Sequence, residues 1–136
     1  MKTLCVIDGM GGGIGAEIIT RLRRELPEDL RIIALGANAA ATERMIQARA
    51  HQGATGENAI LLNVRQADFI LGPLGIAFPN ALMGEITPAM AESLSLAPGV
   101  KILIPVPQPH YHLVGLREEP LGELIAQAVD RLKSLL

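Results

Sequence analysis

The sequence has few aromatic side chains and no excess of positive charge. Among 136 residues there are two phenylalanines, one tyrosine and no tryptophan, and 12 basic residues stand against 14 acidic ones, for a formal net charge of -2. Proteins that bind nucleic acid usually present a basic surface, and those that bind single strands add aromatic rings on which bases stack. We therefore expect no nucleic-acid partner.

Cysteine and long apolar runs are also scarce. Cys5 is the single cysteine, so an internal disulfide cannot form, which favours a reducing compartment. No apolar stretch approaches the roughly 20 residues of a membrane helix, and the N-terminal apolar run is too short for a signal peptide. We therefore expect a cytoplasmic protein without membrane contact, folded as one domain over residues 1–136.

The apolar pattern alternates between strands and helices. Four short apolar runs are typical of strands buried on both faces, namely residues 3–7, 31–35, 68–72 and 101–106. Helical periodicity or capping residues predict helices at residues 14–26 (ended by Pro27), 38–50, 55–67, 87–95 and 120–136. Residues 55–67 could also form a strand, but they lead straight into the run at 68–72, which favours a helix.

These elements predict the α/β class. A fifth strand is expected at residues 111–116, at an edge of the sheet, with an antiparallel orientation as one option because the preceding strand is too close for a crossover. The predicted fold is a three-layer αβα sandwich, Rossmann-like, with about five mostly parallel strands. Two strand orders, both with the second strand beside the first, stay open.

The motif VIDGMGGGIG, residues 6–15, places a glycine-rich turn between the first strand and the first helix. Such a turn lets phosphate oxygens approach backbone N–H groups at the positive end of a helix. A close-packed turn without a ligand is the alternative, and the aspartate could either cap the helix or repel a phosphate. The residues expected to bind a cofactor here are Asp8, Gly9, Gly11, Gly12, Gly13, Ile14 and Gly15.

The spacing G-x-x-x-G-I-G also occurs in short-chain dehydrogenases, but two of their features are missing. The second strand ends in Gly36-Ala37-Asn38, without the acidic residue that holds an NAD ribose. Tyr111, the only tyrosine, is followed four residues later by Gly115, so the Tyr-x-x-x-Lys motif is absent. NAD(P) or another adenine nucleotide remains a candidate cofactor, while hydride transfer by that mechanism is disfavoured.

Further polar groups and glycines follow other strands. Asn38 could bind a ribose or cap a helix, and Thr55, Glu57 and Asn58 could bind a phosphate or sugar or cap the next helix. Gly72 ends the strand predicted at residues 68–72. Because parallel strands end at one edge of a sheet, where open α/β proteins bind ligands, we expect a crevice there.

Three residues are candidates for proton transfer. His110 and His112 share one face if their segment is extended, and either could act as a general acid or base or be an exposed structural histidine. Glu85 could be a site carboxylate or an acid that precedes a helix. Histidine, cysteine and carboxylate residues do not occur at a recognised metal-binding spacing, so we expect no metal site.

Five motifs in sequence order carry a resemblance to a known family: VIDGMGGGIG, IALGANAAAT, GATGENAI, GPLGI and GEITPAMAE. Together they resemble the small bacterial proteins of domain of unknown function 3842. The resemblance covers nearly the whole chain and implies a compact Rossmann-like domain of anaerobic and related bacteria. It implies no established activity.

Three functional hypotheses follow. The first is binding of a small anionic ligand, a nucleotide or dinucleotide, at residues 9–15 with help from Asn38 and residues 55–58. The second is a small enzyme, an oxidoreductase or transferase, that uses the same pocket. The third is a structural subunit of a homo-oligomer, in which a partner covers the apolar segment LGIAFPNALMGEI, residues 74–86.

Overall fold

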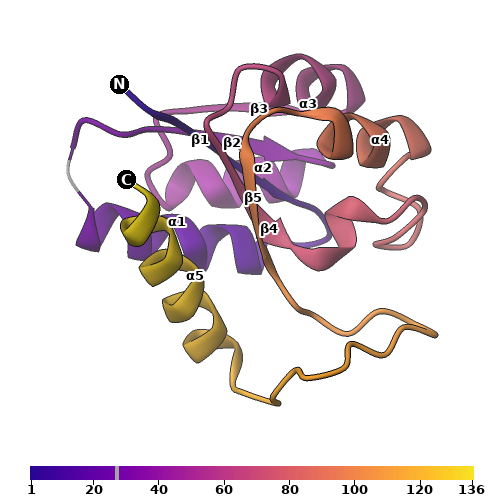
Figure 1. Ribbon diagram of the computed structural model, residues 1–136. Coiled ribbons are helices and arrows are strands. Elements are labelled where there is room, and N and C mark those ends of the chain that lie inside the picture. The colour runs from indigo at the N-terminus through magenta and orange to yellow at the C-terminus, as the bar shows by residue number, and fades with distance from the viewer. Residues whose placement is uncertain (27) are drawn as a thin grey trace.

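The computed structural model describes residues 1–26 and 28–136. In this part of the chain, helices cover both faces of one parallel sheet (Figure 1). The strands are β1 (Thr3–Asp8), β2 (Arg31–Gly36), β3 (Gln52–Thr55), β4 (Phe69–Pro73) and β5 (Val100–Ile104). The helices are α1 (Gly13–Glu25), α2 (Ala39–Gln47), α3 (Glu57–Val64), α4 (Pro88–Leu96) and α5 (Leu121–Leu135), with a 3-10 turn η1 (Leu74–Ala77). The α/β three-layer prediction is confirmed.

The strand order is β3-β2-β1-β4-β5, and every neighbouring pair is parallel. The chain runs outward from β1 to β3 and then returns to β4 on the other side of β1, which selects one of the two orders left open by the sequence. The connections that leave β1 and β4 therefore diverge. Open α/β sheets bind ligands outside the carboxyl ends of the strands at such a switch point.

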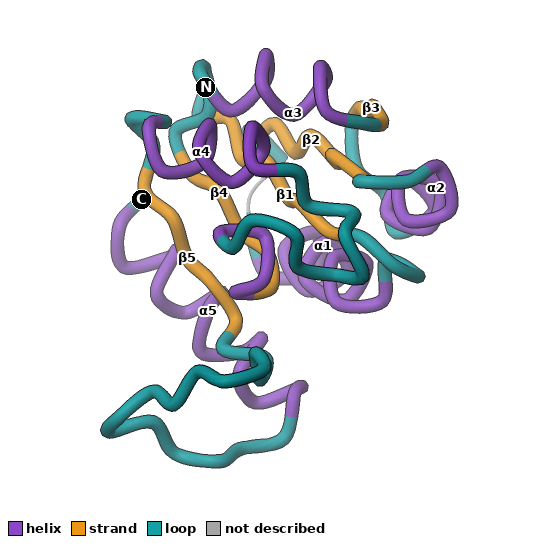
Figure 2. Tube along the Cα trace, turned by 90° about the vertical axis from the view of Figure 1, so that its right-hand side faces the viewer, coloured by secondary structure: helices purple, strands orange, loops and turns teal. Residues whose placement is uncertain are grey.

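Each face of the sheet buries its own apolar cluster. Helices α1, α2 and α5 cover one face, and α3 and α4 cover the other (Figure 2). The alternation along β1 shows the division, because Leu4 and Val6 belong to the first cluster and Cys5 and Ile7 to the second. A strand covered on both faces needs apolar residues at every position, which explains the continuous apolar run.

Local capping explains where two helices begin. The Asn38 side chain accepts a hydrogen bond from the Ala41 N–H (2.8 Å) at the start of α2. Thr87 Oγ1 accepts one from the Met90 N–H (3.1 Å) at the start of α4, and Pro88 occupies the first helical position.

No helix among the described residues combines the length and apolar character needed to cross a membrane.

The predicted edge strand at residues 111–116 is wrong, because that segment is exposed loop. Proline-rich sequence before it removes backbone donors that a strand would use. The fifth strand is instead β3, which pairs in parallel with β2 from Gln52 beside Ile33 to Thr55 beside Gly36. Gly53 lies inside β3, where an added Cβ would stand 2.6 Å from the Ile46 side chain.

Other predicted boundaries shift by a few residues. The helix preferred over a strand at residues 55–67 is confirmed as α3, Glu57–Val64. The helix predicted at residues 38–50 ends at Gln47, and the strand predicted at residues 101–106 spans Val100–Ile104. Pro27, at which the first helix was expected to end, lies outside the described residues.

Candidate functional site

The predicted site residues lie along one edge of the sheet. Asp8 ends β1 beside Gly36, and Gly36 pairs in turn with Thr55 at the end of β3. The structure nevertheless separates most of these residues into three groups: the glycine loop (residues 9–12), the cluster at residues 55–58, and the β5–α5 loop (residues 105–120). Of the three groups, the β5–α5 loop lines the main pocket, together with Ile14, two residues after the glycine loop.

The glycine loop turns tightly from β1 into α1. The Gly12 N–H donates to the Gly9 carbonyl (2.9 Å), and the Gly12 carbonyl accepts from the Ala16 N–H (2.9 Å), which starts α1. Gly12 has φ 74°, a left-handed conformation, and a Cβ there would stand 2.7 Å from Ala41 Cα. Glycine is therefore required at this position both by the backbone conformation and by the close approach of α2.

Asp8 caps α1 from below the loop. The residue is 4% exposed. Its Oδ1 accepts from the Gly9 N–H (2.8 Å) and its Oδ2 from the Gly15 N–H (2.7 Å). Burial raises the pKa of the Asp8 carboxyl and the nearby Glu85 adds to this, while the two backbone donors and Arg44 oppose it. Of the two roles expected for Asp8, the structure therefore shows the helix cap.

The first turn of α1 keeps two donors open on the outer side of the loop. Among the described residues, the N–H groups of Gly13 and Ile14 have no hydrogen-bond partner. Arg44 of α2 lies close to this turn, since a Cβ on Gly13 would stand 3.4 Å from Arg44 Nη1. Sequence reasoning missed Arg44, because only the packing of α2 against α1 carries its guanidinium to the loop.

A second set of contacts, the Glu85 clamp (Met10, Asn38 and Glu85), joins three segments over the ends of β1 and β2. Glu85 Oε1 accepts from the Met10 N–H (2.5 Å), and Oε2 accepts from Asn38 Nδ2 (2.6 Å). Asn38 Nδ2 also donates to the Met10 carbonyl (2.8 Å). Because Asn38 Oδ1 caps α2, both polar atoms of this side chain are already bound within the protein.

The cluster at residues 55–58 makes structural contacts. Thr55 Oγ1 lies 2.7 Å from Thr42 Oγ1, and Glu57 Oε1 accepts from Thr87 Oγ1 (2.8 Å), which links the starts of α3 and α4. Asn58 is exposed. None of these residues lines the main pocket.

Gly72 lies within β4, where a Cβ would collide with the Ile7 carbonyl of β1. This glycine permits close packing of β4 against β1, and it does not line the main pocket either.

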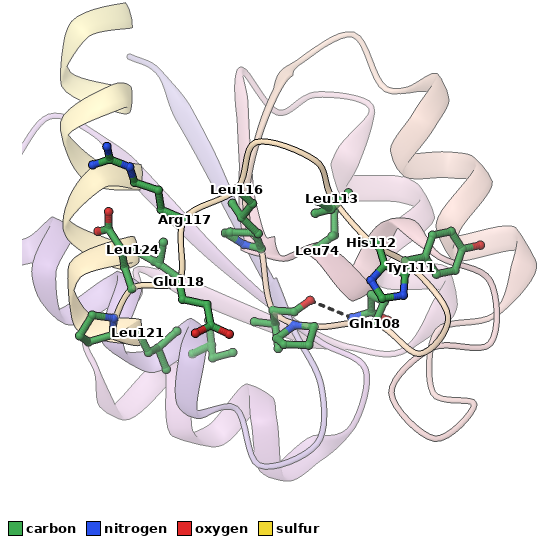
Figure 3. Close-up of a pocket in the computed structure, with 16 residues that line it drawn as sticks. Leu74, Gln108, Tyr111, His112, Leu113, Leu116, Arg117, Glu118, Leu121 and Leu124 are labelled. Carbon is green, nitrogen blue, oxygen red and sulfur yellow. Dashed lines mark hydrogen bonds between the residues drawn. The ribbon is translucent and has the colours of Figure 1, made fainter.

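A pocket of about 860 Å³ lies between the β5–α5 loop and the body of the protein (Figure 3). Most of the wall comes from residues 105–124. Ile14 in the first turn of α1 and Leu74 directly after β4 also line the pocket, so one side of it borders the connections that follow β1 and β4. Its volume is in the range typical of small-molecule sites. Most of its wall is apolar, and the polar side chains are Gln108, Tyr111, His112, Arg117, Glu118 and Glu119.

The three candidates for proton transfer are separated. His112 lines the pocket, whereas His110 and Glu85 do not. His110 has φ 67° in a turn, so the two histidines do not share a face of an extended segment, as the sequence had suggested. Between them, Tyr111 packs its ring on Phe78, with the ring centroids 4.7 Å apart, and so connects the β5–α5 loop to residues 78–86.

Comparison with protein families gives a match over residues 3–136 to the family described as "Domain of unknown function (DUF3842)". The chain belongs to this family. No curated protein matches the sequence. Among solved structures, the chain is similar to a dodecameric FMN-dependent UbiX-like decarboxylase from Escherichia coli O157:H7, with 14% sequence identity and a TM-score of 0.47. That similarity covers 98% of this chain and 94% of the other.

Proposed function

We propose that the protein binds a nucleotide at the switch point between β1 and β4. The observation that carries this proposal is the position of Ile14, which belongs both to the wall of the 860 Å³ pocket and to the open first turn of α1. A ligand there can place an apolar ring in the pocket and a phosphate at the start of the helix. Both halves of a nucleotide thus meet a suitable environment at one place.

The charges on the outer side of the loop favour a phosphate. The unpartnered N–H groups of Gly13 and Ile14 carry the positive end of the helix dipole, and Arg44 adds a full positive charge beside them. The Asp8 carboxylate binds the Gly15 N–H from below and leaves the other two donors available. The residues that would hold the phosphate are therefore Gly13, Ile14 and Arg44.

The test is a thermal-shift and native mass-spectrometry panel of NAD, NADP, FAD, FMN, ATP, AMP and S-adenosylmethionine. A ligand present at 100 times its dissociation constant should stabilise the folded state by about 2.7 kcal/mol. Native mass spectrometry also reports the oligomeric state, with and without ligand.

Two variants test the loop itself. Arg44→Ala should weaken binding at least tenfold, since a hydrogen bond to a charged group contributes about 1.5–3 kcal/mol. Gln47→Ala, on the same helix, is the matched control. Gly11→Val should also weaken binding. The fold should be kept in this variant, because a Cβ at position 11 meets only Arg44 Nη1, at 3.9 Å. Binding that neither variant alters, or a panel without any ligand, would contradict the proposal.

A second candidate function is catalysis in the same pocket, as an oxidoreductase or a transferase. The observation in its favour is that His112 lines the pocket and could exchange a proton with a bound ligand. His112→Ala should then abolish turnover of a ligand found in the panel, whereas His110→Ala, outside the pocket, should not. Equal turnover in the two variants would exclude this role for His112.

The structural-subunit hypothesis placed a partner over residues 74–86. The chain itself covers much of this segment, because Ile76 and Ile86 are 2% and 1% exposed, while Met83 is 91% exposed. This burial weakens the case for a contact made by the whole segment. A stable homo-oligomer in native mass spectrometry that binds no member of the panel would favour the structural hypothesis instead.

A further inference from the structure

We propose that this site takes a mononucleotide and excludes a dinucleotide, and that Glu85 is the residue that sets this selectivity. The inference rests on the proposed nucleotide function and concerns which half of a dinucleotide site is available. The pocket beside α1 is open, whereas the place of a second nucleoside is filled by the protein's own residues 78–86.

In dinucleotide-binding α/β folds, one nucleoside lies across the end of the second strand, on the far side of the glycine loop from the switch point. In this protein, residues 78–86 pack directly onto that place. A Cβ built on Gly9 would stand 2.7 Å from Glu85 Oε1, 2.9 Å from Leu82 Cδ1 and 3.4 Å from Ala37 Cβ. The ends of β1 and β2 are therefore already covered at van der Waals distance.

The Glu85 clamp also occupies the polar groups that a second nucleoside would need. Glu85 binds the Met10 N–H and Asn38 Nδ2, and Asn38 is the residue at the end of β2 where a ribose would be recognised. The carboxylate brings a negative charge to the path of a second phosphate. Steric cover, occupied donors and charge repulsion thus all disfavour the binding of a second nucleoside.

The backbone of residues 78–86 indicates that the clamp holds this segment in place. Asn80, Leu82 and Met83 all have positive φ angles, 66°, 56° and 59°, which residues with a Cβ rarely adopt. Such conformations persist where surrounding contacts determine them. The Asn80 N–H donates to the Ile86 carbonyl (2.6 Å) within the segment, and Phe78 packs on Tyr111 of the β5–α5 loop. The hydrogen bonds that join the segment to the residues after β1 and β2 are those of Glu85. Loss of Glu85 should therefore release the segment from the strand ends while the buried Ile86 keeps it attached.

The experiment compares matched ligand pairs, AMP with NAD and FMN with FAD, by isothermal titration calorimetry on the full chain. For at least one pair, the wild type should bind the mononucleotide at least tenfold more tightly than the dinucleotide. Glu85→Ala should raise the affinity for that dinucleotide at least tenfold and leave the affinity for the mononucleotide within twofold. Glu92→Ala, an exposed carboxylate on α4, should change neither affinity.

Glu85→Gln serves as a second variant that keeps the size of the side chain but removes its charge. It should shift the selectivity in the same direction as Glu85→Ala and by a smaller factor, and it decides the question if Glu85→Ala does not fold.

The outcomes separate this inference from the proposed function. If neither member of either pair binds, this inference fails, and the proposed function fails with it when the other ligands of the panel do not bind either. If the dinucleotide binds the wild type as tightly as its mononucleotide in every pair that binds, or if a folded Glu85 variant keeps the wild-type selectivity, this inference fails while the nucleotide function stands.

Discussion

The glycine loop and the β5–α5 loop both follow a strand at the same edge of the sheet, yet they are built differently. At the start of the glycine loop, Asp8 of β1 is buried and bound to two backbone N–H groups, and within the loop Gly12 packs against the backbone of α2. The β5–α5 loop extends away from the body of the protein (Figures 1 and 2). Val114 near its tip is fully exposed, and Leu113 and Leu116 are about half exposed (49% and 50%).

In the proposed nucleotide site, this difference would separate two tasks. A phosphate site needs N–H groups at fixed positions, and the packed glycine loop would keep them there. A wall around an apolar ring needs area more than fixed geometry, and a loop with few buried contacts can adjust to the ring that it covers. The first loop should therefore be sensitive to added volume at its packed positions, such as Gly12, and the second should tolerate most substitutions.

The largest effect is expected from one glycine substitution in each loop. Gly12 and Gly115 have similar positive φ angles, 74° and 84°, but a Cβ on Gly12 would meet the α2 backbone at 2.7 Å while a Cβ on Gly115 would meet nothing within 4 Å. Gly12→Ala should lower the free energy of unfolding by about 3 kcal/mol, from backbone strain and overpacking together. Gly115→Ala should cost about 1 kcal/mol, from strain alone.

Urea unfolding of the two variants measures this contrast. Equal losses would mean that the approach of α2 does not constrain the glycine loop, and that the two loops differ less than their contacts indicate.

Asp8→Asn should have a smaller effect, and one that depends on pH. An amide has one acceptor oxygen, so either Gly9 or Gly15 loses its bond, at a cost of about 1–3 kcal/mol. Because burial raises the pKa of Asp8 in the folded state, the folded protein holds this proton to a higher pH than the unfolded chain does. The resulting stabilisation is complete below the unfolded pKa of about 3.9 and is lost as the pH rises through the folded pKa.

The advantage of wild type over Asp8→Asn should therefore be larger at pH 4 than at pH 7. Urea unfolding of both proteins at the two pH values tests this sign, since carboxylates that are not coupled to Asp8 contribute equally to both proteins and cancel in the difference. An advantage that grows with pH would show that the two backbone donors outweigh burial at Asp8.

Tyr111→Ala should have the smallest effect on stability. It removes the ring contact with Phe78, and such aromatic pairs contribute about 0.5–1.5 kcal/mol. Because this contact joins the β5–α5 loop to residues 78–86, its loss should also speed proteolytic cleavage within residues 105–120. Tyr111→Phe keeps the ring and is the control. Unchanged cleavage in Tyr111→Ala would show that other contacts hold the loop.

Most of the fold could be read from the sequence, because buried parallel strands and amphipathic helices leave strong local patterns. The runs that became β1, β2, β4 and β5 needed apolar residues on both faces. β3 left no such pattern: Gln52 and Gly53 are exposed, and the strand lies at the edge of the sheet. Pairing with β2, and not the side chains of its own four residues, makes Gln52–Thr55 a strand.

The sequence by itself determined the glycine turn, the capping residues and the shared edge at which the candidate residues lie, because these depend on neighbours along the chain. Only the tertiary structure decided which of them meet. The tertiary fold brought Ile14 and Leu74 to the pocket formed by the β5–α5 loop, and helix packing brought Arg44 to the glycine loop. The fold of residues 78–86 carried Glu85 to Asn38, although 47 positions separate them in the sequence. Contacts over such distances depend on how whole elements pack, and no local pattern records them.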